Sequence, residues 1–158
     1  MFLKSTEYAL RAVVFLARNR AEGKRFGKKE IAERLNFPEP YLAKILQHLA
    51  KNGIIHSAKG PQGGFYATSE TLNYSLLDII EVNEGLGFLK QCGMGLVECN
   101  HDEPCPIHNE YDKVRQSLYK ILSEKKIKEI IDDLDAGIAF MKFEATESNN
   151  RHSHHHDH

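Results

Sequence analysis

The stretch between residues 28 and 52 constrains the fold most, because two short amphipathic segments are separated by two prolines. Residues 28–35 (KKEIAERL) place their apolar side chains on one face of a helix. Pro38 and Pro40 cannot continue that helix, but the first turn of a following helix tolerates proline. We expect this second helix over residues 39–52. Two short helices joined by a tight turn are the pattern of a helix-turn-helix.

The segments on either side complete a recognisable order. Residues 5–19 repeat apolar side chains at helical spacing, so we expect a first amphipathic helix there. Residues 54–57 and 65–67 are predicted strands around a turn rich in glycine and proline, residues 59–64 (KGPQGG). A hairpin directly after the second helix of a helix-turn-helix is a wing. The predicted fold class is therefore mainly α with a small β-hairpin wing, a winged helix-turn-helix followed by a long dimerisation helix.

Charge is divided unevenly along the chain. Residues 1–66 contain 12 Lys and Arg against 5 Asp and Glu, whereas residues 67–158 contain 9 against 17. A solvated surface alone could explain such an excess. Together with the order of elements, the basic first part predicts binding to double-stranded DNA at an operator site. Side chains that we expect at base edges are Pro40, Ala43, Lys44 and Gln47, and those at phosphates are Lys28, Lys29, Lys51 and Lys59. The hairpin tip adds Gln62 and Gly63, on a glycine-rich backbone that can approach a minor groove closely.

Three cysteines within fourteen residues predict a metal site. Cys92, Cys99 and Cys105 form, with His108, the spacing C-x6-C-x5-C-x2-H in a segment rich in glycine and proline. Thiolates with one imidazole suit zinc or an iron–sulfur cluster. The pattern has no C-x2-4-C knuckle, and the wide spacing favours a cluster over a single zinc ion. Three unrelated buried thiols are the alternative, and we expect His101 to be a solvent-exposed loop residue rather than a ligand.

Two further helices are expected around this loop. Residues 75–83 begin with the capping-box pattern Ser-x-x-Asp. Residues 109–122 repeat apolar side chains in a narrow seam that suits a partner helix, at Tyr111, Val114, Leu118 and Ile121. A core helix is the alternative interpretation, but a homodimer would double the DNA site. Residues 127–134 have one apolar face, which we expect to pack against the helix over residues 109–122.

These segments define four parts of the chain. They are a winged helix-turn-helix domain (1–83), a cysteine-rich cluster-binding loop (84–108), a dimerisation helix with a C-terminal helical segment (109–144), and a disordered His-rich tail (145–158).

The longest uncharged apolar run near the start has six residues, far short of the about 20 that a membrane span needs. We therefore expect a cytoplasmic protein. The sequence has no C-x-x-C pair, nucleophile–base motif or nucleotide loop, so we expect neither an enzyme nor a small-molecule substrate.

In combination, these segments resemble the Rrf-type family of winged-helix iron–sulfur transcription regulators of bacteria, which has IscR-like and NsrR-like members. The resemblance covers roughly residues 1–135. It lies in STEYALRAVVFLA (5–17), IAERLNFPEPYLAKILQHLAKNGII (31–55), KGPQGGFYAT (59–68) and LLDII (76–80), followed by the cysteine loop and the next helix.

The resemblance implies a homodimeric regulator whose three cysteines ligate an iron–sulfur cluster, 2Fe–2S in preference to 4Fe–4S. In IscR-like members the fourth ligand is a histidine at the position of His108. In some NsrR-like members it is an acidic residue of the partner chain, at the position of Glu7. We favour His108 because it is local. The implied function is sensing of redox state, nitric oxide or iron–sulfur status, and the alternative is a structural zinc site without sensing. Ala43 replaces a glutamate of IscR-like members, so a switch between two classes of DNA site is not expected.

Overall fold

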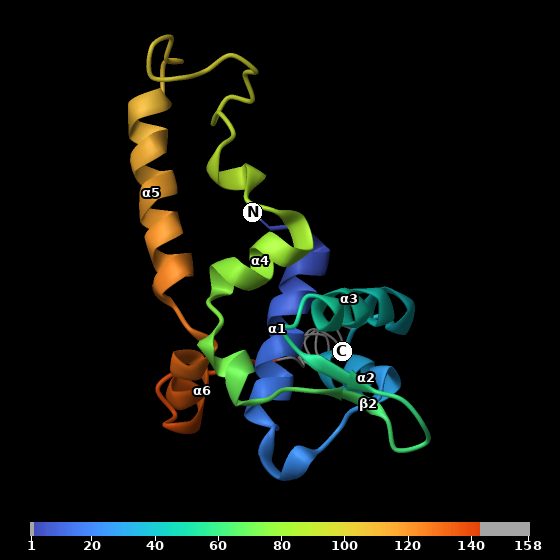
Figure 1. Ribbon diagram of the computed structural model, residues 1–158. Helices are drawn as coiled ribbons and strands as arrows, with labels where there is room; N and C mark the ends of the chain where they lie inside the picture. Colours follow the sequence, from blue (N-terminus) through green and yellow to red (C-terminus); the bar gives the residue numbers. More distant parts are fainter. Residues whose placement is uncertain (1, 143–158) are drawn as a thin grey trace, which may run out of the picture.

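The computed structural model describes residues 2–142, and most of these residues are helical (Figure 1). The mainly α fold with a small hairpin is confirmed. Within the described residues, no helix is long and apolar enough to cross a bilayer. The predicted tail over residues 145–158 lies outside them. The elements are α1 (Lys4–Arg18), η1 (Ala21–Gly23), α2 (Lys28–Leu35), α3 (Glu39–Lys51), β1 (His56–Ala58), β2 (Gly64–Tyr66), η2 (Ser69–Asn73), α4 (Leu76–Glu84), η3 (Gly87–Leu89), α5 (His108–Glu124) and α6 (Ile127–Asp135).

The helix-turn-helix of α2 and α3 follows from the residues between them. Asn36 adopts a left-handed conformation, with φ at 58°, and ends α2. Pro38 is the N-cap of α3, and Pro40 lies in its first turn, where its missing N–H costs no hydrogen bond. The inner face of α3 is buried against α1 and α2 through Leu42, Ile45, Leu46 and Leu49.

The hairpin forms a two-stranded antiparallel wing in which His56 pairs with Tyr66. The strand predicted to start at residue 54 begins two residues later. The reason is the end of α3, because the N–H of Ile54 donates to the carbonyl of Leu49 and both Ile54 and Ile55 are buried in the core. These two residues therefore belong to the helix cap and the core rather than to the wing.

The prediction that residues 127–134 pack against the preceding helix is wrong, because α6 packs on α1. Its buried side chains, Ile127, Ile131 and Leu134, belong to the same apolar core as α1 and α3. An ion pair of 3.1 Å between Arg18 and Asp135 also joins α1 to α6. The winged-helix core thus includes a helix that follows α5 in the chain.

In contrast, α5 and the segment before it extend beyond this core as an arm (Figure 1). The foot of the arm is a small apolar cluster in which Leu122 packs with Leu77 and Ile80 of α4. Backbone hydrogen bonds from Leu76 to Lys125 and from Ile127 to Tyr74, of 3.0 and 2.9 Å, tie the start of α4 to the end of α5. The predicted capping box of α4 is confirmed by reciprocal hydrogen bonds between Ser75 and Asp78. The arm is therefore anchored at one end, and the cysteine loop lies at the other.

Candidate metal centre and DNA-binding face

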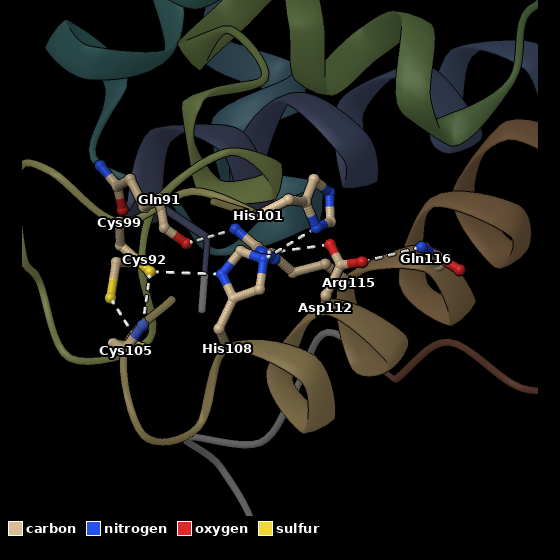
Figure 2. A network of polar contacts seen from close by, with 9 residues as sticks. All are labelled: Gln91, Cys92, Cys99, His101, Cys105, His108, Asp112, Arg115 and Gln116. Atoms are coloured by element: carbon tan, nitrogen blue, oxygen red, sulfur yellow. Dashed lines mark hydrogen bonds and ion pairs between the residues drawn. The ribbon is translucent and has the colours of Figure 1, made fainter. Parts of the chain in front are cut away.

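The loop at the far end of the arm brings the three cysteines together. The Sγ atoms of Cys92, Cys99 and Cys105 all lie within 4.8 Å of one another, and those of Cys92 and Cys105 are 3.5 Å apart (Figure 2). All three thiols are free and partly buried. Three thiols of one loop therefore converge, which favours a metal group that they share over three unrelated buried cysteines.

His108 is the first residue of α5, and its side chain is only 7% exposed. Its Nδ1 atom lies 3.2 Å from the Sγ atom of Cys99, so it joins the edge of the thiol group. On the other side, its Nε2 atom lies 3.3 Å from the Nδ1 atom of His101 (Figure 2). His101 is exposed, as expected from the sequence, but its contact with His108 is not visible in the sequence spacing, because it depends on how the loop turns.

Backbone N–H groups surround the sulfur atoms. The N–H of Met94 points to the Sγ atom of Cys92 at 3.4 Å, and the N–H of Cys105 points to that of Cys99 at 3.4 Å. Hydrogen bonds from the backbone of Leu96 and Met94 lower the pKa of the Cys92 thiol to about 7. Partial burial raises the pKa of the Cys105 thiol. Donors aimed at sulfur favour thiolate, the form that binds soft metals, so this donor set fits a thiolate-bound metal or cluster.

The spacing of the sulfur atoms bears on which group fits. In a tetrahedral zinc site with Zn–S bonds of about 2.3 Å, two sulfur atoms lie about 3.8 Å apart. The Sγ atoms of Cys92 and Cys105 are 3.5 Å apart, and no two of the three Sγ atoms are more than 4.8 Å apart, so the observed separations are near this value. A cluster places cysteines on more than one iron, so the same thiols would have to separate somewhat to ligate it.

Glu7, the other predicted candidate for a fourth ligand, lies on α1 and outside this thiol group. Its carboxylate is 3.8 Å from the ammonium of Lys4 and 4.0 Å from the guanidinium of Arg11. Its predicted role concerns the partner chain, and it stays a prediction.

The residues predicted to contact DNA lie on the outer surface of the winged helix. Eight of the ten are exposed: Lys28, Lys29, Pro40, Lys44, Gln47, Lys51, Lys59 and Gln62. Ala43 and Gly63 are half-buried. At the wing tip, a Cβ on Gly63 would lie 2.2 Å from the carbonyl oxygen of Ala58, so the turn requires glycine there.

Three further surface residues belong to this face, and no local sequence pattern singles them out. Tyr41 is 70% exposed on α3, next to Pro40. The guanidinium of Arg25 lies 5.4 Å from the ring of Tyr66, and the ammonium of Lys24 lies 4.8 Å from that of Phe26, so both cations flank the wing. The basic excess of residues 1–66 includes Lys24 and Arg25, but only the fold places them beside the hairpin.

Known proteins share this architecture. Residues 2–133 match the model of the Rrf2 family, described as iron-dependent transcriptional regulators. An Aquifex aeolicus protein described as an HTH-type transcriptional regulator is 31% identical over 134 residues, 84% of this chain and 92% of the relative. Among solved structures, the cysteine regulator CymR of B. subtilis aligns with a TM-score of 0.68 and 24% identity, over 84% of this chain and 96% of its own. T. potens IscR aligns with a TM-score of 0.67 and 24% identity, over 90% and 94%.

The family match spans nearly all of the winged helix, the cysteine loop, α5 and α6. It agrees with the helix-turn-helix, the wing and the exposed basic face. The chain belongs to the Rrf2 family of DNA-binding transcriptional regulators.

Proposed function

We propose that this regulator senses redox state, nitric oxide or iron–sulfur status through a cluster bound by Cys92, Cys99, Cys105 and His108. The observation that supports this most is the convergence of three thiols within 4.8 Å, with His108 beside them. The iron dependence in the family description and the likeness to an IscR point the same way. When bound, a 2Fe–2S or 4Fe–4S cluster would supply a redox-active centre that oxygen or nitric oxide can attack.

The position of the loop explains how such a group would affect DNA binding. Cys92 follows α4 and η3, whereas Cys105 and His108 stand at the start of α5. Ligands on both sides therefore fix the end of the α4 segment relative to α5. Because α4 also packs on α1 and α3, an ordered loop restricts where two recognition helices of a dimer can lie. Coupling of this kind is typically worth about 1–3 kcal/mol, or 5- to 150-fold in affinity.

The DNA-binding arrangement that we propose is that of a homodimer in the cytoplasm. α3 enters the major groove of an operator, and the basic wing reaches the adjacent minor groove. α5 supplies the dimer contact, since Val114 and Ile121 are each 61% exposed and lie on one face of the helix. Apolar side chains so exposed on a long helix favour a partner helix.

A second candidate is a DNA-binding regulator in which the same loop holds a structural zinc ion. The specific observation in its favour is the sulfur spacing of 3.5 Å between Cys92 and Cys105, which suits one tetrahedral ion. In that case removal of the metal would unfold the arm rather than switch it.

Anaerobic purification followed by a visible spectrum and assays of iron, acid-labile sulfide and zinc separates the two. A version ending at residue 145 is preferable, because five histidines beyond it can bind metal: His152, His154, His155, His156 and His158. Visible absorption with equal iron and sulfide supports the cluster, and one zinc per chain without visible absorption supports the structural ion.

The sensing step needs its own test. An operator fragment is first selected from genomic DNA with the metal-loaded protein, and its affinity for loaded and metal-free protein is then compared at one salt concentration. We expect a difference of at least about fivefold. Equal affinities would contradict sensing for that operator, while leaving the DNA-binding role intact.

A further inference from the structure

Two side chains of α5 hold the residues on either side of Cys92. Arg115 donates from Nη1 to the backbone carbonyl of Gln91, at 2.7 Å (Figure 2). On the other side of the cysteine, the ring of Tyr111 packs so closely on Gly93 that a Cβ there would lie 2.8 Å from two ring carbons. The guanidinium of Arg115 and the ring of Tyr111 also stack, at 5.3 Å. Cys92 is thus bracketed by contacts with a single pair of α5 residues.

Arg115 is unusually buried for a charged residue on an otherwise exposed helix. Its side chain is 11% exposed, and its charge is balanced by Asp112 at 3.1 Å. Asp112 is itself held by the side-chain amide of Gln116, at 2.9 Å. Among residues 2–142, the Nε atom of Arg115 is buried without a hydrogen-bond partner. Burying a guanidinium costs free energy unless it is paired and hydrogen-bonded. The contacts of Arg115 with Asp112 and Gln91 therefore hold its side chain in place, and the contact with Gln91 is the shorter of the two.

The other three candidate ligands are connected to α5 without Arg115 or Tyr111. His108 is part of the helix, and Cys105 precedes it by one loop turn, in which the N–H of His108 donates to the carbonyl of Cys105 at 3.1 Å. Cys99 contacts His108 directly. Cys92, by contrast, is distant from α5 in the chain, and the contacts of its two neighbours with Arg115 and Tyr111 hold it beside the helix.

We propose that Arg115 and Tyr111 form a clamp that positions Cys92 relative to Cys99, Cys105 and His108, and so makes the first thiol a ligand of the metal centre. The inference rests on the proposed function, since it concerns the same site. Neither side chain belongs to the candidate ligand set, so both are positioning residues. Without the clamp, Cys99, Cys105 and His108 remain together, while Cys92 moves with the segment that follows α4.

Substitutions at two positions, Arg115 and Gly93, should release the clamp. Arg115→Ala removes the hydrogen bond to Gln91, and Arg115→Lys keeps the charge but loses the planar fork that donates to two partners. Gly93→Ala forces the loop away from Tyr111 without changing Arg115. Lys113→Ala, which removes an exposed charge from the same helix, is the control for Arg115, and Gly87→Ala is the control for Gly93 because no atom lies within 4 Å of the added Cβ.

The first measurement is titration of the reduced, metal-free full chain with Co²⁺, followed only by its thiolate charge-transfer absorption, which reports bound cysteines and not Co²⁺ held by the histidines beyond residue 145. A metal buffer sets the free Co²⁺ concentration, so those histidines do not change the affinity that is read. We expect Arg115→Ala and Gly93→Ala each to lose about a third of this absorption and to bind Co²⁺ about 10- to 100-fold more weakly. Arg115→Lys should fall between Arg115→Ala and the wild type, and both controls should match the wild type. If either Arg115→Ala or Gly93→Ala kept full absorption, the clamp would not position Cys92 and the proposal would be wrong.

The second measurement is amide hydrogen exchange over residues 90–96 in the metal-free chain, with circular dichroism to verify that helix content is unchanged. We expect exchange to be at least about tenfold faster in Arg115→Ala and Gly93→Ala than in the wild type. Unchanged exchange in either variant would overturn the clamp. If the wild type bound no metal while exchange was still faster in the two variants, the clamp would stand and the proposed function would be wrong.

Discussion

The Nδ1 atom of His108 lies 3.2 Å from the Sγ atom of Cys99, although the two residues belong to different elements, α5 and the loop. The opposite nitrogen of the same ring faces His101 at 3.3 Å. A histidine ligand usually has its second nitrogen held in this way, which fixes the orientation of the ring. Within residues 2–142, the Glu7 carboxylate is paired with Lys4 and Arg11 rather than with a thiol.

His108→Ala should therefore lower the metal or cluster content of anaerobically purified protein about 10-fold or more. Glu7→Ala should leave the metal content unchanged. Glu110 is an exposed residue in the first turn of α5, and Glu110→Ala serves as the control, which should also leave the content unchanged. Iron, sulfide and zinc per chain give the measurement. Loss of metal in Glu7→Ala with full content in His108→Ala would assign the fourth ligand to the partner chain's first helix.

Cys92 should be more reactive than Cys105 in the reduced, metal-free protein near neutral pH. The pKa of Cys92 is lowered to about 7 by backbone hydrogen bonds from Leu96 and Met94, so about half of it is thiolate at pH 7. Burial raises the pKa of Cys105, so that thiol stays almost entirely protonated. Mass spectrometry after brief iodoacetamide treatment should show at least about tenfold faster labelling of Cys92. The ratio should fall as pH rises and Cys105 ionises, and equal rates at pH 7 would contradict the prediction.

Lys59→Ala should weaken binding to all DNA sequences by a similar factor, because Lys59 lies exposed at the wing and is predicted to contact phosphate. The slope of log affinity against log salt should become shallower by about one unit. Fluorescence anisotropy on two unrelated fragments at several salt concentrations measures both effects. Lys120→Ala, which removes an exposed charge from α5, should leave the slope as it is, and an unchanged slope in Lys59→Ala would exclude that phosphate contact.

Val114→Asp or Ile121→Asp should separate the proposed dimer. Each places a charge where an apolar side chain would be buried between two copies of α5, at a cost of roughly 3 kcal/mol, or more than about 100-fold in dimer affinity. Sedimentation at several concentrations measures the dissociation constant. Lys120→Asp, on another face of α5, is the control. An unchanged dimer in both variants would place the interface elsewhere.

Ile131→Ala should destabilise the winged helix even though it lies beyond α5 in the sequence. Its side chain is 3% exposed in the core shared with α1, and such truncations cost about 2–5 kcal/mol. Urea unfolding at one protein concentration provides the free energy. Ile138→Ala, at a position that is 76% exposed, should change it by less than about 0.5 kcal/mol.

The sequence predicted those features that depend on near neighbours in the chain. The bounds of α2 and the buried stripe of α3 followed from apolar spacing and from proline, and the capping box at Ser75 followed from two residues. The packing partner of α6 did not follow, because an apolar face does not specify which surface covers it. For the same reason, the apolar residues predicted to form one seam on α5 have different surroundings: Leu118 packs at the foot of the arm, whereas Val114 is exposed.

The candidate site shows the same division. Spacing and residue type predicted that the three cysteines and His108 lie together, and in the structure the thiols converge with His108 beside Cys99. The contact of His101 with His108 and the burial of Arg115 depend on how a glycine-rich loop turns back on α5, and no local pattern encodes that turn. Charged residues on a helix are ordinarily solvated, so the sequence gives no reason to select Arg115.

The packing of α6 against α1 has a consequence for the order of events during synthesis. Ile127, Ile131 and Leu134 complete the core of the DNA-binding unit, yet they follow the cysteine loop in the chain. As the polypeptide leaves the ribosome, one side of α1 stays uncovered until α6 emerges, and by then all three thiols have already been outside the exit tunnel. The three cysteines and His108 are therefore outside the ribosome while the core of the winged helix still lacks the helix that covers one side of α1.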